Sequence, residues 1–263
     1  MIVLGFDTST AATAAALRLA DGSTTQTRDD PAAGAHPGHA TRLLEMSREL
    51  LAGAGVAWSE IDRIAVGVGP GTFTGLRVGV ATARGLAQSL AAELVGVSSL
   101  RALAAVALAP GQHMGEPLQA ETGTLLGVID ARRGEVFAAA YERGDPGGPE
   151  ELGDPGVPRE LAHARALAPE ALASVVAEVE AAGGGRRRWL AVGDGALRYR
   201  LQLQSAGIAT PPDSSPLHLV SAAAVCELAA LAPAASLHEL VPDYRRRPDA
   251  ELALVGAGRG SVT

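Results

Sequence analysis

Residues 67–86 read GVGPGTFTGLRVGVATARGL, a pattern that predicts a strand, a tight glycine turn and then a helix. Residues 64–68 form a short apolar run that predicts a strand, and the Gly-Pro-Gly that follows breaks it. Thr72 or Thr74 offers a side-chain oxygen to cap a helix, which we expect over Thr74–Ala91. The helix start could take an anion, or the turn could simply join strand to helix. It is no Walker loop, because no Lys follows the glycines.

One face of the predicted helix is nearly bare of side chains. Four positions recur at spacings of three and four residues and share this face: Gly75, Gly79, Thr82 and Leu86. Glycine costs a helix interior about 1 kcal/mol relative to Ala, so we expect something to pack very close there. Arg77 and Arg84 lie seven residues apart on another face, where they meet either solvent or the acids of a partner.

The same stretch closely resembles the bacterial TsaB (YeaZ) family, whose members are dimerisation subunits of the complex that makes threonylcarbamoyladenosine in tRNA. The specific matches are PGTFTGLRVG at 70–79, ARGLA at 83–87 and LVGVSSLRALA at 94–104. Weaker matches are IVLGFDTST at 2–10, IDARRGEVFAAAY at 129–141, VGDGA at 192–196 and, more loosely, PDYRR at 242–246. The resemblance therefore spans most of the chain.

The chain opens with three predicted strands in a meander, at Ile2–Phe6, Ala11–Leu19 and Ser23–Thr27. A second hairpin, at Thr124–Asp130 and Glu135–Tyr141, repeats this opening. Together with the resemblance, this predicts an α/β protein with the actin-like ATPase (ASKHA, ribonuclease H-like) fold, with two similar lobes of mixed sheets flanked by helices. We expect one lobe at 1–108 joined by a last helix at about 218–233, a second at 109–217, and a tail at 234–263.

In this superfamily the first hairpin meets phosphates and a metal. Here the candidate nucleotide-binding residues are Asp7, Thr8, Ser9, Asp130, Gly193 and Gly195. Asp at a strand end can hold Mg²⁺ through water, and hydroxyl groups can donate to phosphate. The alternative is that the same groups satisfy their own turns. The resemblance implies a degenerate site, so we expect no required cofactor and at most weak ATP or ADP binding.

His36 and His39 suggest a metal site, but the pattern is incomplete. The catalytic paralogue of the family carries two histidines four apart on the equivalent helix, and here Leu43 stands four after His39. We therefore expect no metal site and no catalytic residues, with a capping or surface role for His39. The rival hypotheses are an ATP-dependent phosphotransferase that uses Asp7 and Asp130, and a metallopeptidase.

Composition limits the class of partner and compartment. The net charge of −7 argues against a chain that holds RNA unaided. The single Cys226 excludes an internal disulfide and fits a reducing cytosol. Asp7 interrupts the apolar opening, which has no basic start, so we expect no signal peptide. No apolar run is long enough to span a bilayer. These features predict a cytoplasmic protein with no membrane association.

The resemblance implies a non-catalytic subunit that binds and stabilises TsaD, with the ATPase TsaE at the seam, tRNA contact only within the complex, and a homodimer when alone. The helices expected at Gly38–Ala52 and Thr74–Ala91 would form the interface. Its residues would be Leu43, Leu44, Gly75, Arg77, Gly79, Thr82 and Leu86. On this hypothesis, Gly79→Trp blocks the partner and leaves the fold intact.

Overall fold

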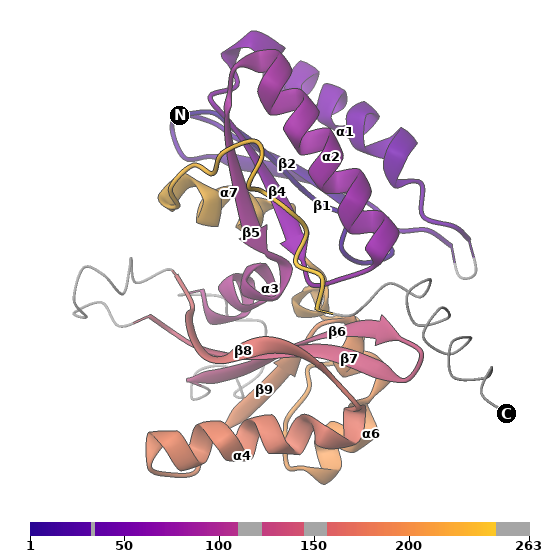
Figure 1. Ribbon diagram of the computed structural model, residues 1–263, viewed down its shortest axis with the longest axis vertical. Helices are drawn as coiled ribbons and strands as arrows, with labels where there is room; N and C mark the ends of the chain where they lie inside the picture. Colours follow the sequence, from indigo (N-terminus) through magenta and orange to yellow (C-terminus); the bar gives the residue numbers. More distant parts are fainter. Residues whose placement is uncertain (33–34, 110–122, 145–156, 246–263) are drawn as a thin grey trace, which may run out of the picture.

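The computed structural model describes residues 1–32, 35–109, 123–144 and 157–245, which form two lobes (Figure 1). The first lobe contains a five-stranded sheet in the order β3-β2-β1-β4-β5. Its strands are β1 (Val3–Asp7), β2 (Thr13–Arg18), β3 (Thr24–Asp29), β4 (Arg63–Gly69) and β5 (Glu93–Ser98). The first three form the predicted antiparallel meander, and β4 and β5 run parallel to β1.

The second lobe repeats this topology with a four-stranded sheet in the order β8-β7-β6-β9. Its strands are β6 (Thr124–Arg132), β7 (Glu135–Glu142), β8 (Arg159–Leu167) and β9 (Trp189–Val192). Three antiparallel strands again come first, and a parallel strand then joins the first of them. The order β8-β7-β6-β9 matches β3-β2-β1-β4 of the first lobe, and two mixed sheets related in this way confirm the predicted actin-like fold.

Helices cover both sheets and form the layer between them (Figure 1). In the first lobe α1 (His39–Ala54) and α2 (Phe73–Leu90) lie on the outer face of the sheet. The helices α3 (Ser99–Leu108) and α7 (Ala222–Leu231) lie on the other face, toward the second lobe. The second lobe adds α4 (Leu172–Gly183), α5 (Asp194–Arg198) and α6 (Arg200–Ser205), with short 3₁₀ turns at Trp58–Glu60, Pro169–Ala171 and Pro216–His218.

The core between the two sheets is continuous. Val3 and Val95 of the first sheet, Leu103 and Val225 of the middle helices, and Leu125 of the second sheet belong to one buried cluster. The lobes therefore share apolar packing through α3 and α7, and burial of this surface is the dominant stabilising term for such a layer.

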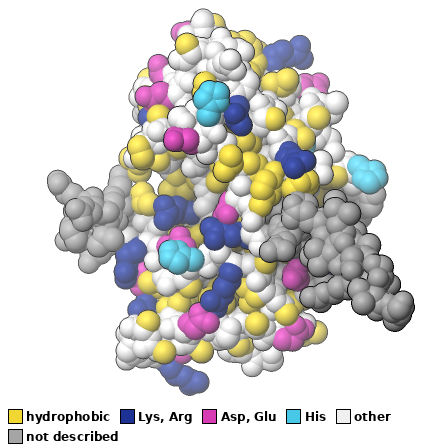
Figure 2. Space-filling model, in the orientation of Figure 1, with side chains coloured by type: hydrophobic (Ala, Val, Ile, Leu, Met, Phe, Trp, Pro, Cys, Tyr) yellow, Lys and Arg dark blue, Asp and Glu magenta, His cyan; other side chains and the backbone are white. Residues whose placement is uncertain are grey.

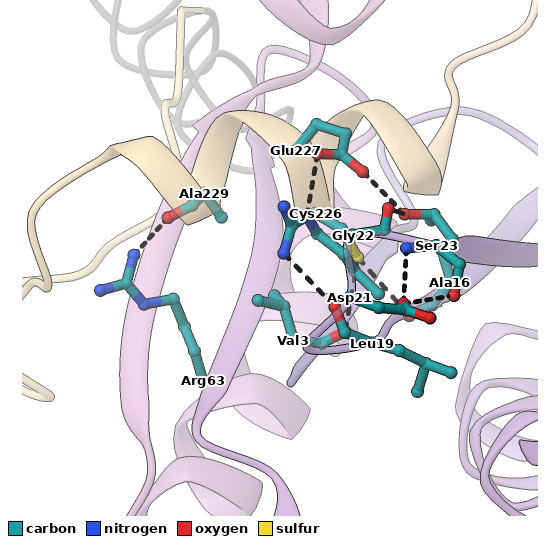
Figure 3. Close-up of polar contacts among 12 residues, drawn as sticks. Val3, Ala16, Leu19, Asp21, Gly22, Ser23, Arg63, Cys226, Glu227 and Ala229 are labelled. Carbon is teal, nitrogen blue, oxygen red and sulfur yellow. Dashed lines mark hydrogen bonds and ion pairs between the residues drawn. The ribbon is translucent and has the colours of Figure 1, made fainter. Parts of the chain in front are cut away.

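The helix α7 packs against β1 and β2 of the first lobe (Figure 3). Cys226 is fully buried, and its Sγ lies 3.7 Å from the Val3 carbonyl oxygen and 3.6 Å from that of Ala16. Burial raises the pKa of this thiol to about 12. The buried Arg63 of β4 donates to the Ala229 and Ala232 carbonyl oxygens at the end of α7, where a helix has carbonyl groups without the usual amide partner four residues later.

Two parts of the fold differ from the sequence expectation. Residues 234–245 are no tail, because Ala235 pairs with Leu94 at the β5 edge and Leu240 is buried against the outer core of the first lobe. The strand β8 has no counterpart in the predicted elements, because its Arg, Glu and Ala residues favour a helix in isolation. The rest of the predicted tail, 246–263, lies outside the described residues.

Candidate functional site

The turn after β1 holds the first group of candidate nucleotide-binding residues. Asp7, Thr8 and Ser9 are all buried, with at most 1% of their surface exposed. One carboxylate oxygen of Asp7 accepts from the Ser9 amide at 2.8 Å and from the Ser9 hydroxyl at 2.6 Å. The other accepts from the Ser99 hydroxyl at 2.6 Å, a contact absent from the sequence predictions. Both oxygens of Asp7 therefore have partners within the chain.

The first turns of α2 pack directly on this turn. The Thr8 hydroxyl donates to the Gly75 carbonyl oxygen at 2.7 Å, and the Thr72 amide donates to the Ser9 carbonyl oxygen at 2.7 Å. A Cβ atom at Gly75 would lie 2.0 Å from the Thr8 carbonyl oxygen, and one at Gly79 would lie 2.4 Å from the Thr8 hydroxyl. The bare helix face therefore packs against this chain's own turn, and the assignment of Gly75 and Gly79 to a partner interface is wrong.

The helix α2 begins without the predicted side-chain cap. Thr72 is the N-cap residue and has an extended backbone, but its side chain accepts no capping hydrogen bond, and Thr74 lies within the helix. Because the Thr72 amide bonds to Ser9, this donor is not available to an anion. The turn matches the simpler of the two interpretations, a close strand-to-helix connection.

The second lobe gathers the other candidates at the end of β6. Asp130 accepts from the Arg132 amide at 2.9 Å and from the Arg198 guanidinium at 2.9 Å. Its own amide donates to Asp194 at 3.0 Å. Burial raises the pKa of Asp194 above its ordinary value, with a smaller contribution from the charge of Asp130. The pairing of Asp130 with Arg198 was not predicted, because 68 residues separate them in the sequence.

The two glycines at the start of α5 are explained by packing on β6. Gly193 has φ +106°, and a Cβ there would lie 2.1 Å from the Val128 carbonyl oxygen. A Cβ at Gly195 would lie 2.9 Å from the Ile129 carbonyl carbon and 3.0 Å from the Asp130 amide nitrogen. The structure thus brings Gly195 next to Asp130, and the side of each glycine that lacks a Cβ faces the chain's own backbone.

His39 is neither a cap nor a surface residue, which corrects the sequence expectation. It is the first residue of α1 and only 4% exposed, and its Nδ1 lies 2.9 Å from the Thr13 hydroxyl. Burial lowers the pKa of His39 below its ordinary value, against the opposing charge of Asp7. In the part of the chain that the structure describes, no group of three or more His, Cys, Asp or Glu residues could hold a metal ion.

The predicted partner surface on α1 and α2 is accessible only in part. Leu43 is 1% exposed and packs in the core, so its assignment to the interface is also wrong. Leu44 is 47% exposed, Arg77 is exposed, and Thr82 and Leu86 are half-buried. The exposed stripe of α2 also includes Ala81 and Gly85, next to the half-buried Val78, and all three are missing from the prediction. Their spacing of three and four residues could have predicted that they share one face of the helix.

Within the described ranges, no helix has the length and apolar character needed to cross a membrane.

Comparisons with known proteins agree with one another. The family model for TsaD, described as tRNA N6-adenosine threonylcarbamoyltransferase, matches residues 31–209. The TsaB protein of Escherichia coli is 36% identical over 109 residues, which cover 41% of this chain and 43% of that protein. The TsaB protein of Haemophilus influenzae is 37% identical over 143 residues, 54% of this chain and 55% of that one. The matched segments thus span about half the length of these curated relatives.

Solved structures extend the likeness to nearly the whole chain. YeaZ from Pseudomonas aeruginosa is 29% identical with a TM-score of 0.69, and the match covers 92% of this chain and 99% of that one. A second structure, described as an uncharacterized protein with similarity to peptidase YEAZ from the same organism, is 28% identical with a TM-score of 0.70, covering 93% and 99%. From these matches and the shared fold, the chain belongs to the TsaB (YeaZ) family, within the wider group that the TsaD family model describes.

Proposed function

We propose that this chain is a non-catalytic subunit in the biosynthesis of threonylcarbamoyladenosine in tRNA, and that it binds and stabilises TsaD. TsaD would transfer the threonylcarbamoyl group from its adenylate to the adenosine next to the anticodon. This chain would contribute a binding surface and no reacting group. The names of its TsaB relatives support the pathway, and the geometry of the turn after β1 supports the structural role.

The observation that carries the proposal is the complete use of the Asp7 carboxylate within the fold. Catalysis on a phosphate would need this carboxylate or the hydroxyls of Thr8 and Ser9 to face a ligand. Instead, Ser9 and Ser99 donate to Asp7, and Thr8 donates to Gly75. Releasing these groups would leave buried polar atoms unpaired, at a cost of about 1–3 kcal/mol each.

The exposed stripe on α2 supplies the surface. Gly85 is exposed in the interior of the helix, and a Cβ there would have nothing within 4 Å. Glycine costs a helix roughly 1 kcal/mol, and at Gly75 close packing on Thr8 explains its presence. No packing within the described chain requires a glycine at position 85. With Ala81 and the exposed Leu44 of α1, Gly85 offers a surface that another helix can approach closely. Such a contact needs about 800 Å² on each partner to be stable.

The remaining partners follow from the same proposal. TsaE would join at the seam between this chain and TsaD. Contact with tRNA would occur only within the complex, because the isolated chain has a net charge of −7. In the absence of TsaD, the chain would form a homodimer through the same outer face of α1 and α2. All of these steps would take place in the cytoplasm.

The test is co-purification of the tagged chain with TsaD from the same organism. Gly85→Trp places a large side chain on the exposed stripe without an internal clash, so we expect it to abolish association and to leave the thermal unfolding temperature near the parent value. Gly185→Trp is the matched control, because a Cβ there also meets nothing within 4 Å and the residue lies beyond α4 in the other lobe. Gly79→Trp is unsuitable, because its side chain would clash with Thr8. Association retained by Gly85→Trp would contradict the proposal.

A further inference from the structure

The two helices on the outer face of the first lobe have a charge opposite to that of the whole chain. Together α1 and α2 contain four arginines and two glutamates, which gives a formal charge of +2. The complete chain has a net charge of −7. Figure 2 shows dark blue side chains next to yellow ones over α2, at the upper right of the view. This face is therefore basic in an acidic protein.

Most of these arginines have no acidic partner in the described chain. Arg42 pairs with Glu45 and lies 3.6 Å from a carboxylate oxygen of Asp29. For Arg48, Arg77 and Arg84, no carboxylate of the described residues lies within 4 Å of a guanidinium nitrogen. Within the described residues, the two helices thus carry three arginines without an acidic partner, against one glutamate, Glu49, without a basic partner.

Arg77 is held in place, although it is exposed. Its guanidinium carbon lies 3.9 Å from the centre of the Phe73 ring, and its Nε donates to the Tyr244 hydroxyl at 3.1 Å. The Phe73 and Tyr244 rings themselves lie 5.1 Å apart. No described acceptor bonds to its two terminal nitrogens. A guanidinium fixed in this way loses little conformational entropy when it pairs with a carboxylate.

The position of Arg84 extends this arrangement along α2. Arg84 lies seven residues after Arg77 and therefore points from the same side of the helix two turns later. The exposed Ala81 lies between them, and Gly85 follows. A helix that packs over these small residues would bring its own flanking side chains to the two guanidinium groups.

We infer that the outer face of α1 and α2 selects its partner by charge, binding an acidic helical surface in preference to the second copy of this chain that it would bind in the absence of TsaD. The inference rests on the proposed function and adds the chemistry of the partner surface. Two copies packed through this face would oppose charges of the same sign, which destabilises an interface. A protein partner is favoured over RNA because Leu44, Val78 and Ala81 make the centre of the face apolar or small.

The test measures two associations of the full chain at about 50 mM and about 500 mM NaCl, a range over which exposed charges become screened. Calorimetry gives the affinity for TsaD of the same organism, and analytical ultracentrifugation gives self-association. The variant is Arg77→Gln/Arg84→Gln. The matched control is Arg143→Gln/Arg186→Gln, which removes the same charge from two exposed arginines of the second lobe.

We expect the variant to weaken TsaD binding about fivefold at low salt, at roughly two- to threefold for each of the two arginines. The control should stay within about twofold of the parent. Salt should weaken the complex with TsaD and strengthen self-association, so the two salt dependences have opposite signs. In the variant, both associations should depend less on salt than in the parent.

Three results would overturn the inference. These are TsaD binding that neither salt nor the double substitution changes, self-association that salt weakens, and tRNA binding by the isolated chain that the substitutions abolish. Absence of any complex with TsaD at either salt concentration would instead overturn the proposed function, and this inference with it.

Discussion

The hydroxyl of Thr8 and the carbonyl oxygen of Gly75 lie 2.7 Å apart, joined by a hydrogen bond between the turn after β1 and the first turns of α2. The contact is possible only because Gly75 lacks a Cβ. It packs α2 directly on the turn at Asp7–Ser9, which the resemblance marks as a candidate nucleotide-binding turn. The same residues that resemble a nucleotide site thus become part of the packing of the first lobe.

Gly75→Ala should destabilise the protein. The new methyl group would meet the Thr8 backbone, which cannot move as a flexible side chain can, so we expect a loss of about 1–3 kcal/mol in the free energy of unfolding. Gly85→Ala is the matched substitution on the same helix, and it should stabilise by about 0.5–1 kcal/mol because its methyl group meets nothing. Urea denaturation followed by circular dichroism measures both. Equal effects of the two substitutions would contradict the packing described for Gly75.

Asp7→Asn separates the structural role of this carboxylate from a catalytic one. The amide group would place a donor where a serine hydroxyl now donates, so we expect a loss of about 1–3 kcal/mol in stability. Under the phosphotransferase hypothesis, the same change would instead abolish nucleotide binding. Calorimetric titration of the unmodified chain with Mg²⁺-ATP gives the reference. Micromolar binding by the parent chain that Asp7→Asn removes would favour the enzyme.

Arg63→Met should loosen the attachment of α7. The Arg63 guanidinium bonds to Glu93 and to the Ala229 and Ala232 carbonyl oxygens at the end of α7, and its removal breaks these bonds. Figure 3 shows the bond to Ala229. We expect a loss of about 2–4 kcal/mol, with faster amide exchange in α7. Arg18→Met is the comparison, because Arg18 pairs with the half-exposed Glu227 and should cost under about 1 kcal/mol. A smaller loss for Arg63→Met than for Arg18→Met would refute this assignment.

His39 should make the protein less stable in mild acid. Its pKa is lowered in the folded state, so below its ordinary value of 6.5 the unfolded chain takes up a proton that the folded chain resists. This contribution to stability is present above pH 6.5 and is lost as the pH falls through the folded pKa. We expect His39→Gln to reduce the fall in urea midpoint between about pH 7.5 and about pH 5.5. His36→Gln, which removes an exposed imidazole, is the control.

The sequence predicted those parts of the fold that depend on local pattern. The opening meander and the strand-turn-helix unit at residues 64–90 follow from apolar runs broken by glycine and proline, and the structure confirms them. The strand β8 could not be predicted, because it is a strand only through its pairing with β7. Residues 234–245 likewise gain order from β5 and the core of the first lobe, not from their own pattern.

In the candidate site, too, local pattern predicted some features, while others depend on contacts between distant residues. Spacing predicted that one face of α2 carries small residues, and the structure confirms close packing there. Spacing did not reveal whether the neighbour is another protein or Thr8 of the same chain, because that depends on where the turn after β1 lies in the folded lobe. The contacts of Ser99 with Asp7 and of Arg198 with Asp130 join distant residues that no local motif connects.

The return of α7 to β1 and β2 bears on how the protein is made. Val3 and Ala16 meet Cys226, so β1 and β2 keep an uncovered side until α7 has also been synthesised. At roughly 5–20 residues added per second, that interval is on the order of ten seconds. During that interval the two strands expose apolar surface that α7 later covers, so a translation product that ends before α7 would be prone to aggregation.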